Sequence, residues 1–325
     1  MSLHRLTRIV MGVPNVEQTA SYYAEFGLTP AATDVTSIYG VQSPAPGPDA
    51  GHRFTTVDGG EQLSVVPSER RRLVQLGIGA DDPDDLDRVA ASLTALDVAI
   101  ERTPTSVRAI EPGTDLIVRV EIADRVDQAP TPAPPYNTPG VNARTEQRAS
   151  CILRDQPVRP RKLGHVVLGS TDQEFSQKFF QHGIGLKVSD TVSGLASFMR
   201  CSTDHHNVLV QQAPVAYLHH TSWQVDDIDE VGRGATAMLE KDPDRHVWGL
   251  GRHHIGSNFF WYLRDPAGNF SEYYSDLDCI VDDALWKPQV WDGAYGLYNW
   301  GPPPPPSFLA PQDLAGLMTG AHSGG

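Results

Sequence analysis

An internal repeat is the feature that most restricts the fold of this chain. Residues 6–28 and 163–186 share one order: a short apolar strand, a polar turn, an amphipathic helix and a glycine that ends the helix. The same order recurs over residues 74–96 and 219–239. Alternating segments with turn signals follow each opening, and they predict further strands, for example at residues 117–123 and 259–263. Four units of one strand, one helix and three strands are the simplest account.

Such a unit has an incomplete sheet whose open face needs a partner, so we expect the units to pair within each half of the chain. The repeat therefore predicts an α+β fold of four βαβββ modules paired into two domains, each a curved mixed sheet that encloses a cleft. A small ligand would bind in such a cleft.

A stretch rich in Pro, Ala and polar residues divides the chain in the middle. We expect an N-terminal domain of two modules over residues 1–125, a linker over 126–160, a second domain of two modules over 161–276 and a tail over 277–325. The tail should be an extended segment that aromatic side chains pack onto a domain or a neighbouring subunit. Those side chains are Trp286, Trp291, Tyr295, Tyr298 and Trp300.

Composition narrows the classes of partner. The formal net charge of -14 argues against a surface that binds nucleic acid or an anionic membrane. We find no apolar run of about 18 residues and no signal-peptide pattern, so we expect a cytoplasmic protein. The odd number of cysteines, without CxxC spacing, predicts buried free thiols at Cys151, Cys201 and Cys279.

The repeat also shows which polar residues are extra in one copy, because copies of one scaffold share core residues and differ at a working site. Three residues of the C-terminal half that could bind a metal are replaced in the N-terminal half, which we therefore expect to lack a metal. Aligned by motif, His165 stands opposite Arg8, His220 opposite Gln75 and Glu272 opposite Ile117.

Two imidazoles and one carboxylate leave three adjacent coordination positions open, which is how non-haem Fe(II) holds substrate and O2 together. Mn(II) accepts the same ligands, whereas zinc prefers a closed four-coordinate site or one with a single water. Each residue also has an ordinary structural role. A histidine in an apolar strand is more often a hydrogen-bonded core residue, and a glutamate at a strand end is more often solvated. The residue pattern alone leaves both roles open.

The segment from Gly251 to Tyr274 resembles the signature of type I extradiol dioxygenases of the vicinal oxygen chelate superfamily. That signature runs from a histidine through a tyrosine and an Asp-Pro-x-Gly turn to a ligand glutamate. The matching residues are His253, Tyr262, Asp265, Pro266, Gly268 and Glu272. Residues 164–168 and 218–227 are similar to the strands that carry the family's two ligand histidines.

The resemblance implies the vicinal oxygen chelate fold and one Fe(II), with Mn(II) as an alternative, held by His165, His220 and Glu272. His219 is then expected to face away from the site, because side chains alternate along a strand. Trp261 departs from the family pattern, which has an aliphatic residue or Phe there, and we expect it to alter the shape of the pocket.

The resemblance also implies the catalytic residues. A pocket histidine precedes the second ligand in the family, and His206 matches it better than His205, which we expect to be a surface turn residue. His206 would assist proton transfer and stabilise charge on oxygen. His253 and Tyr262 would hydrogen-bond the substrate oxygens, and His254 is expected to be structural.

The implied function is cleavage of a catechol-type ring by O2 outside the diol, in the degradation of aromatic compounds. The aromatic tail, in turn, favours a homo-oligomer. Two alternatives remain. A metal-dependent lyase or isomerase like glyoxalase would explain the metal but not His206, His253 and Tyr262. A ligand-binding protein of the bleomycin-resistance type would need no metal ligands at all.

Overall fold

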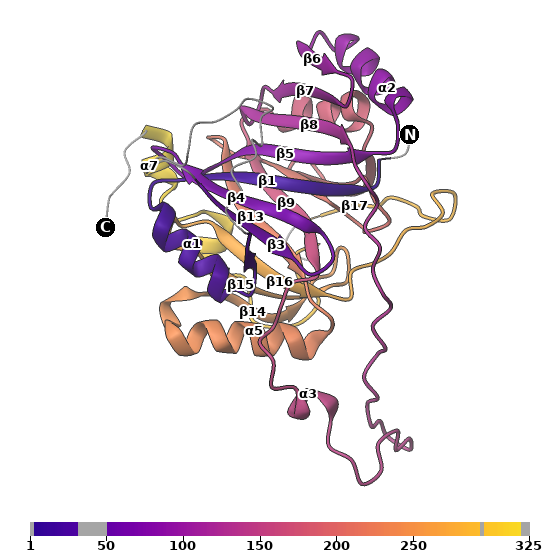
Figure 1. Cartoon of the computed structure of the whole chain (residues 1–325), viewed down its shortest axis with the longest axis vertical. Helices are drawn as coiled ribbons and strands as arrows, with labels where there is room; N and C mark the ends of the chain where they lie inside the picture. Colours follow the sequence, from indigo (N-terminus) through magenta and orange to yellow (C-terminus); the bar gives the residue numbers. More distant parts are fainter. Residues whose placement is uncertain (1–2, 32–50, 293–295, 320–325) are drawn as a thin grey trace.

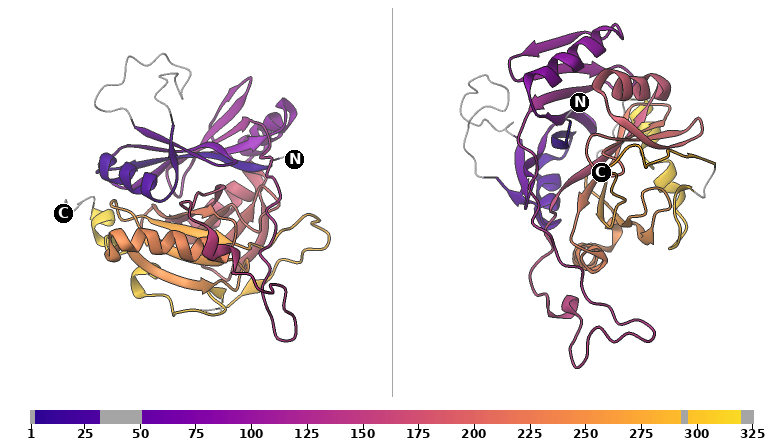
Figure 2. Two further views of the ribbon diagram at one scale, coloured as in Figure 1. Left: turned by 60° about the horizontal axis from the view of Figure 1, so that its bottom comes forward. Right: turned by 90° about the vertical axis from the view of Figure 1, so that its right-hand side faces the viewer.

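The computed structural model describes residues 3–31, 51–292 and 296–319 (Figure 1). Its strands form two large sheets, one from each half of the chain. Figure 2 shows the two halves packed against each other, with the segment between them reaching out from the body. Among the described residues, no helix has the length and apolar character needed to cross a membrane.

The N-terminal half forms an eight-stranded sheet in the order β2-β3-β4-β1-β5-β8-β7-β6. The strands β1 and β5 lie side by side and antiparallel at its centre, so the two modules meet there. The strands are β1 (Arg5–Val13), β2 (Thr29–Pro30), β3 (His52–Thr56), β4 (Gly60–Pro67), β5 (Arg72–Ala80), β6 (Ile100–Thr103), β7 (Ser106–Glu111) and β8 (Leu116–Ile122), and the helices are α1 (Val16–Glu25) and α2 (Pro83–Thr94).

The C-terminal half repeats this plan in a nine-stranded sheet, β14-β15-β16-β13-β9-β12-β11-β10-β17. Its strands are β9 (Lys162–Ser170), β10 (Lys187–Val192), β11 (Ala196–Arg200), β12 (Val208–Gln212), β13 (Tyr217–Gln224), β14 (His246–Arg252), β15 (Phe259–Arg264), β16 (Phe270–Ser275) and β17 (Val290–Trp291). Its helices are α4 (Gln173–Lys178), which continues as a π-helical turn over Phe179–Ile184, α5 (Ile228–Lys241) and a 3₁₀ turn at Pro243–Arg245. Four βαβββ modules paired within each half are thus confirmed.

Sequence signals mark the starts of three of the four module helices and the ends of two. The carboxylates of Asp82, Asp172 and Asp227 accept backbone N–H groups at the starts of α2, α4 and α5. Gly27 and Gly185 follow the first helix of each half with a φ of +98°, a left-handed conformation that favours glycine. After each of these glycines the chain leaves the helix and re-enters the sheet.

The two halves share one continuous apolar core. Phe26, just after α1, stacks on Tyr273 of β16 with ring centroids 3.8 Å apart, and the Tyr273 hydroxyl donates to the Phe26 carbonyl oxygen at 2.6 Å. Tyr22 of α1 hydrogen-bonds Ser271 of β16. The first module therefore supports the back of the strand that carries Glu272.

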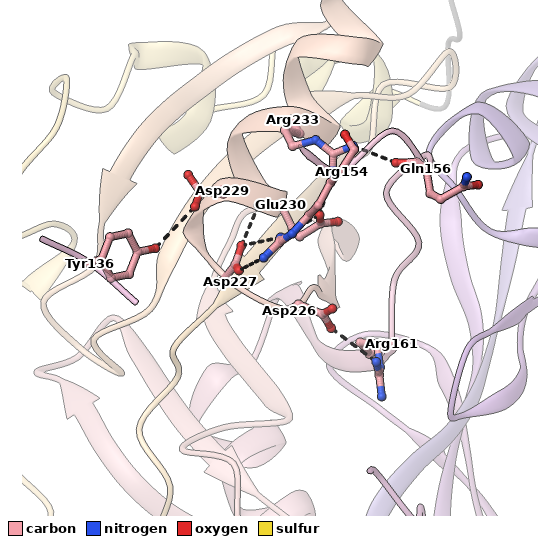
Figure 3. A network of polar contacts seen from close by, with 9 residues as sticks. All are labelled: Tyr136, Arg154, Gln156, Arg161, Asp226, Asp227, Asp229, Glu230 and Arg233. Atoms are coloured by element: carbon pink, nitrogen blue, oxygen red, sulfur yellow. Dashed lines mark hydrogen bonds and ion pairs between the residues drawn. The ribbon is translucent and has the colours of Figure 1, made fainter. Parts of the chain in front are cut away.

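The segment between the halves is tied to the start of α5 (Figure 3). Arg154, just after the short helix α3 (Ser150–Leu153), pairs with Asp227 at 2.6 Å and with Glu230 at 2.9 Å. Arg233 donates to the carbonyl oxygens of Arg154 and Gln156. Burial alone would raise the pKa of Asp227, but the hydrogen bond and charge of Arg154 outweigh it and lower that pKa. The Asp227 carboxylate is therefore held ionised.

The tail packs onto the second sheet and the first half. Strand β17 extends the sheet beside β10, and Trp286 donates to the Ser189 carbonyl oxygen at 2.8 Å. The tail ends in α6 (Pro306–Leu309) and α7 (Leu314–Thr319), and Asp313 between them forms a two-pronged ion pair with the buried Arg71. Tyr295 lies outside the described residues.

The prediction of buried thiols is correct only in part. All three cysteines are free, and Cys201 is buried, but Cys151 is half-buried and Cys279 is exposed. Cys151 lies in the segment that reaches out from the body, and Cys279 lies in the tail.

Candidate metal centre

The predicted ligands lie on three neighbouring strands at the centre of the second sheet. In the pairing of β9 with β13, His165 lies opposite Ser222, and in the pairing of β13 with β16, Ser222 lies opposite Glu272. His220 lies two residues before Ser222 on β13, and therefore on the same face. The strand register thus brings two imidazoles and one carboxylate together.

The geometry of these side chains fits a metal ion. One ligand atom from each of His165, His220 and Glu272 lies within 4.8 Å of the others. A Glu272 oxygen is 3.1 Å from Nε2 of His165 and 3.7 Å from Nε2 of His220. With bonds of about 2.1 Å, two adjacent ligand atoms of one ion would lie roughly 3 Å apart.

The burial of these three side chains also fits a metal site. All three side chains are buried, and Glu272 is 0% exposed. Nε2 of His220 has no hydrogen-bond partner within the described part of the chain. A buried polar atom without a partner costs free energy, and a bound cation would remove that cost.

Two donors orient the Glu272 carboxylate. The Ser222 hydroxyl donates to one oxygen at 2.6 Å, and the Asn258 amide donates to the other at 3.0 Å. Burial alone would raise the pKa of Glu272, but the hydrogen bonds and charges of His165, His253 and Ser222 outweigh it and lower that pKa. The carboxylate is therefore an anion, as a metal ligand must be.

The expectation that His219 faces away from the site is wrong. A bulge between Leu218 and His220 breaks the alternation of β13, and Nδ1 of His219 lies 2.7 Å from Nδ1 of His220. Nε2 of His219 lies 2.7 Å from the carbonyl oxygen of Phe308, which can only accept. His219 therefore donates to Phe308 and accepts from His220, which leaves Nε2 of His220 with its lone pair toward the other ligands.

The ring of His206 lies over the same cluster, 4.2 Å from the His165 ring between centroids. It is 4% exposed, and burial holds its pKa well below the ordinary value, with the neighbouring histidines adding to the effect. The prediction that His205 is a surface residue is wrong, because this side chain is 0% exposed. The tail segment around Trp286 covers it.

His253 and Tyr262 form a pair beside the ligands. The Tyr262 hydroxyl lies 2.8 Å from Nε2 of His253, and Nδ1 of His253 hydrogen-bonds the Leu297 carbonyl oxygen. The carbonyl can only accept, so His253 carries its proton on Nδ1 and accepts from Tyr262. Burial, followed by the charge of Glu272, raises the pKa of Tyr262 well above its ordinary value. Tyr262 is therefore a neutral donor.

The prediction that Trp261 shapes the pocket is wrong. Side chains alternate along β15, so Trp261 and Tyr262 point to opposite faces. Trp261 donates to His246 at 3.1 Å and packs against the large core, whereas Tyr262 packs with Trp248 and Phe308 beside the ligands. A substitution in the signature thus falls outside the cleft.

The corresponding row of the N-terminal sheet carries arginines. Arg8 pairs with Gly77, and Gly77 pairs with Arg119, just as His165 pairs with Ser222 and Ser222 with Glu272. The match of Glu272 with Ile117 is therefore wrong by two residues, because Ile117 lies opposite Gln75. Both guanidinium groups contact Glu121 at 3.1 Å, and two cations in that row would repel a metal ion.

Sequence reasoning missed several residues around the ligands. Ser222 carried a usable signal, since it lies two residues from His220 on the same face of one strand. Asn258 and Phe308 carried none, because a loop and the distant tail bring them to the cleft.

Comparison with known proteins agrees with the geometry. A profile of the Glyoxalase/Bleomycin resistance protein/Dioxygenase superfamily matches residues 162–273. Metapyrocatechase 2 of Cupriavidus necator is 28% identical over 95% of this chain and 92% of its own length. An iron-dependent extradiol dioxygenase of Rhodococcus jostii is 23% identical over 69% of this chain and 77% of its own. The Mn(II)-bound glyoxalase of Novosphingobium aromaticivorans superposes with a TM-score of 0.71 at 24% identity, over 98% of this chain and 97% of its own.

The paired βαβββ modules and the superfamily match define a protein of the vicinal oxygen chelate fold. The relatives named above as a metapyrocatechase and an extradiol dioxygenase match most of this chain, in agreement with the resemblance of its C-terminal motif.

Proposed function

We propose that this protein is an extradiol dioxygenase that opens a catechol-type ring with O2 at one Fe(II), or alternatively Mn(II), in the degradation of aromatic compounds. The observation that carries the proposal is the buried row of His165, His220 and Glu272, whose donor atoms are spaced for adjacent positions on one ion. The names of the relatives support the same activity.

His165, His220 and Glu272 would hold the ion, and an Fe(II) bound there would let a catechol and O2 share one centre. The chain's own groups then handle protons and orientation. The Tyr262 hydroxyl, which donates to His253 in the structure, would turn its one proton to a catechol oxygen and so fix the position of that oxygen. His206, beside His165, would receive the proton that the catechol loses and return it when the O–O bond breaks.

The glyoxalase-like alternative has a specific observation in its favour, the superposition on a protein of that name at 24% identity. That likeness is one of fold alone. The polar set of His206, His253 and Tyr262 beside the ligands favours the dioxygenase. Turnover of a catechol panel under air by protein loaded anaerobically with Fe(II) is the direct test. Growth of a yellow ring-opened product supports the proposal, whereas intact catechols, together with isomerisation of a thiol–oxoaldehyde adduct supplied in a parallel assay, would favour the alternative.

The ligand assignment has its own test. His165→Ala, His220→Ala and Glu272→Ala should each lose the metal and turnover while keeping the fold, because these substitutions leave the apolar residues of the main core in place. Circular dichroism and metal analysis of each variant check this. A variant that keeps one tightly bound ion and normal turnover would remove that residue from the site.

The N-terminal row gives a matched control. Arg8, Gln75 and Arg119 should bind no divalent ion when crystals are soaked in Mn(II), because two guanidinium groups occupy the row. Density for an ion there would contradict the assignment of the metal to the second half alone.

We further propose that the protein is cytoplasmic and assembles as a homo-oligomer. The segment that reaches out from the body carries exposed apolar side chains, with Tyr136 at 50% and Ile152 and Leu153 each at 68% exposure (Figure 2). Exposed apolar side chains on this projecting segment, here called the arm, support its binding to another copy of the chain. Ile152→Asp with Leu153→Asp should lower the mass measured by sedimentation, and an unchanged mass would exclude the arm from the interface.

A further inference from the structure

A chain of polar groups lies behind His206 and has no part in the mechanism proposed above. Nδ1 of His206 is 3.1 Å from Nδ1 of His205, and Nε2 of His205 is 3.3 Å from a carboxylate oxygen of Asp190. His205 is 0% exposed, and the other two are each 4% exposed. Three neighbouring titratable groups are thus shut away from water.

Several parts of the fold hold this chain in place. Asp190 lies at an irregularity of β10, and its second oxygen accepts the backbone N–H of Gln289 at 2.7 Å. The edge of Trp286 packs on the His205 ring, with centroids 5.3 Å apart. Phe198 packs on the rings of both histidines. The tail therefore covers the Asp190–His205 pair and leaves His206 as its outlet to the cleft.

The acceptors and donors fix the direction of the hydrogen bonds. Asp190 accepts the Gln289 N–H through one carboxylate oxygen, and its other oxygen accepts from Nε2 of His205. With its proton on Nε2, His205 has its lone pair on Nδ1, which accepts the Nδ1 proton of His206. This leaves Nε2 of His206 without a proton, and that atom makes no hydrogen bond within the described part of the chain. The same order holds in the chain from Phe308 through His219 to the ligand His220.

We propose that Asp190 and His205 are positioning residues that hold His206 as its Nδ1-protonated tautomer, so that Nε2 accepts a proton from the bound catechol. The inference rests on the proposed function for its role in turnover, but the tautomer itself does not depend on that function. The proton leaves a catechol hydroxyl, forms the His206 imidazolium, and returns to an oxygen of the cleaved substrate. Asp190 acts through His205, since the two hydrogen bonds in series hold the orientation and the tautomer of the His206 ring.

The first test measures where the proton lies. Nitrogen-15 shifts of histidine-labelled protein, loaded with diamagnetic Zn(II), should show His206 protonated on Nδ1. In Asp190→Asn the amide oxygen keeps the Gln289 N–H, so its NH2 group faces His205. His205 must then donate to His206, and the His206 proton should move to Nε2. An Nε2 proton in the wild type, as a His205 imidazolium would require, overturns the proposal, as does an unchanged tautomer in the variant.

The second test separates binding from chemistry. Asp190→Asn should keep its iron and its anaerobic catechol affinity but lose about 10- to 100-fold in kcat, below the 10²- to 10⁴-fold range of general acid–base assistance because His206 itself remains. His205→Phe keeps the ring packing and should show a similar loss. His205→Gln retains one donor and one acceptor and should recover about tenfold over His205→Phe, which is less than the full 10²- to 10⁴-fold contribution of acid–base assistance.

Asp283→Asn is the matched control for docking of the tail. Asp283 also joins the tail to this sheet, through Arg200 at 2.5 Å and through Lys187, but it does not contact the histidines. Its kcat should stay within about twofold of the wild type, well under one power of ten. An equal loss of kcat in Asp283→Asn, a normal kcat in Asp190→Asn, or no recovery in His205→Gln would each overturn the positioning role. A wild type that leaves catechols intact would instead refute the proposed function, while the nitrogen-15 result would still stand.

Discussion

Removal of the Ser222 hydroxyl should weaken metal binding without abolishing it. This hydroxyl donates to the fully buried Glu272 carboxylate at 2.6 Å, where water has little access to replace it. A hydrogen bond to a charged group contributes about 1.5–3 kcal/mol. Since about 1.4 kcal/mol corresponds to a factor of ten, Ser222→Ala should raise the metal dissociation constant roughly 10- to 100-fold. Asn258 still orients the second oxygen, so some binding should remain.

Anaerobic competition against a chelator of known affinity measures this constant. Ser271→Ala is the matched control. Ser271 directly precedes Glu272 on β16 and is as buried as Ser222, but it lies on the other face of the sheet and hydrogen-bonds Tyr22. That variant should lower the free energy of unfolding and leave metal affinity unchanged. Equal metal loss in both variants, or no change in Ser222→Ala, would refute the reasoning from the hydrogen bond.

Further variants test proton transfer at the site, the packing of the tail and the ionisation of Asp265. His206→Phe should keep iron and catechol binding but lose about 10²- to 10⁴-fold in kcat, and Tyr262→Phe should lose less, because one hydrogen bond to a charged oxygen is worth about 1.5–3 kcal/mol. Phe308→Ala should make the tail sensitive to limited proteolysis, since truncation of a buried Phe costs about 3–5 kcal/mol and α6 has only four residues. Burial raises the pKa of Asp265 to about 6, so this group stabilises the fold below pH 4 and loses that contribution as the pH rises to 6; urea titrations should show Asp265→Asn gaining about 2–3 kcal/mol on the wild type over that window.

Each of these has a contradicting result. Loss of iron in His206→Phe would make that residue a ligand and not a proton carrier. A larger loss of kcat in Tyr262→Phe than in His206→Phe would reverse their roles. An unchanged proteolysis pattern in Phe308→Ala would show that other contacts hold the tail. A pH-independent difference between Asp265→Asn and the wild type would mean that Asp265 is ionised throughout.

The fold could be predicted because its signals are local and repeated. Each module opens with an apolar strand, three of the four module helices begin at an aspartate cap such as Asp227 before α5, and two are followed by a glycine such as Gly185 after the π-helical turn that continues α4. The three candidate ligand positions could be singled out because they are the residues that break the repeat. The match of Glu272 was two residues off, since the turns before β8 and β16 differ and only the strand register reveals it.

The surroundings of the ligands could not be predicted because they depend on contacts between distant segments. The burial of His205 requires the tail around Trp286, which lies about eighty residues further along the chain. The orientation of His219 depends on a bulge that alternation rules do not foresee. The wrong prediction for Trp261 did not depend on distant contacts. The alternation of side chains along β15 alone places Trp261 on the face opposite Tyr262.

The most direct test of the central claim supplies protein that contains one Fe(II) per chain with a catechol and ¹⁸O2, and analyses the product by mass spectrometry. We expect a ring-opened product that carries both ¹⁸O atoms, formed by the wild type and absent with Glu272→Ala. An intact ring, or a product that carries no ¹⁸O, would contradict the assignment of His165, His220 and Glu272 to the metal centre of a ring-cleaving dioxygenase.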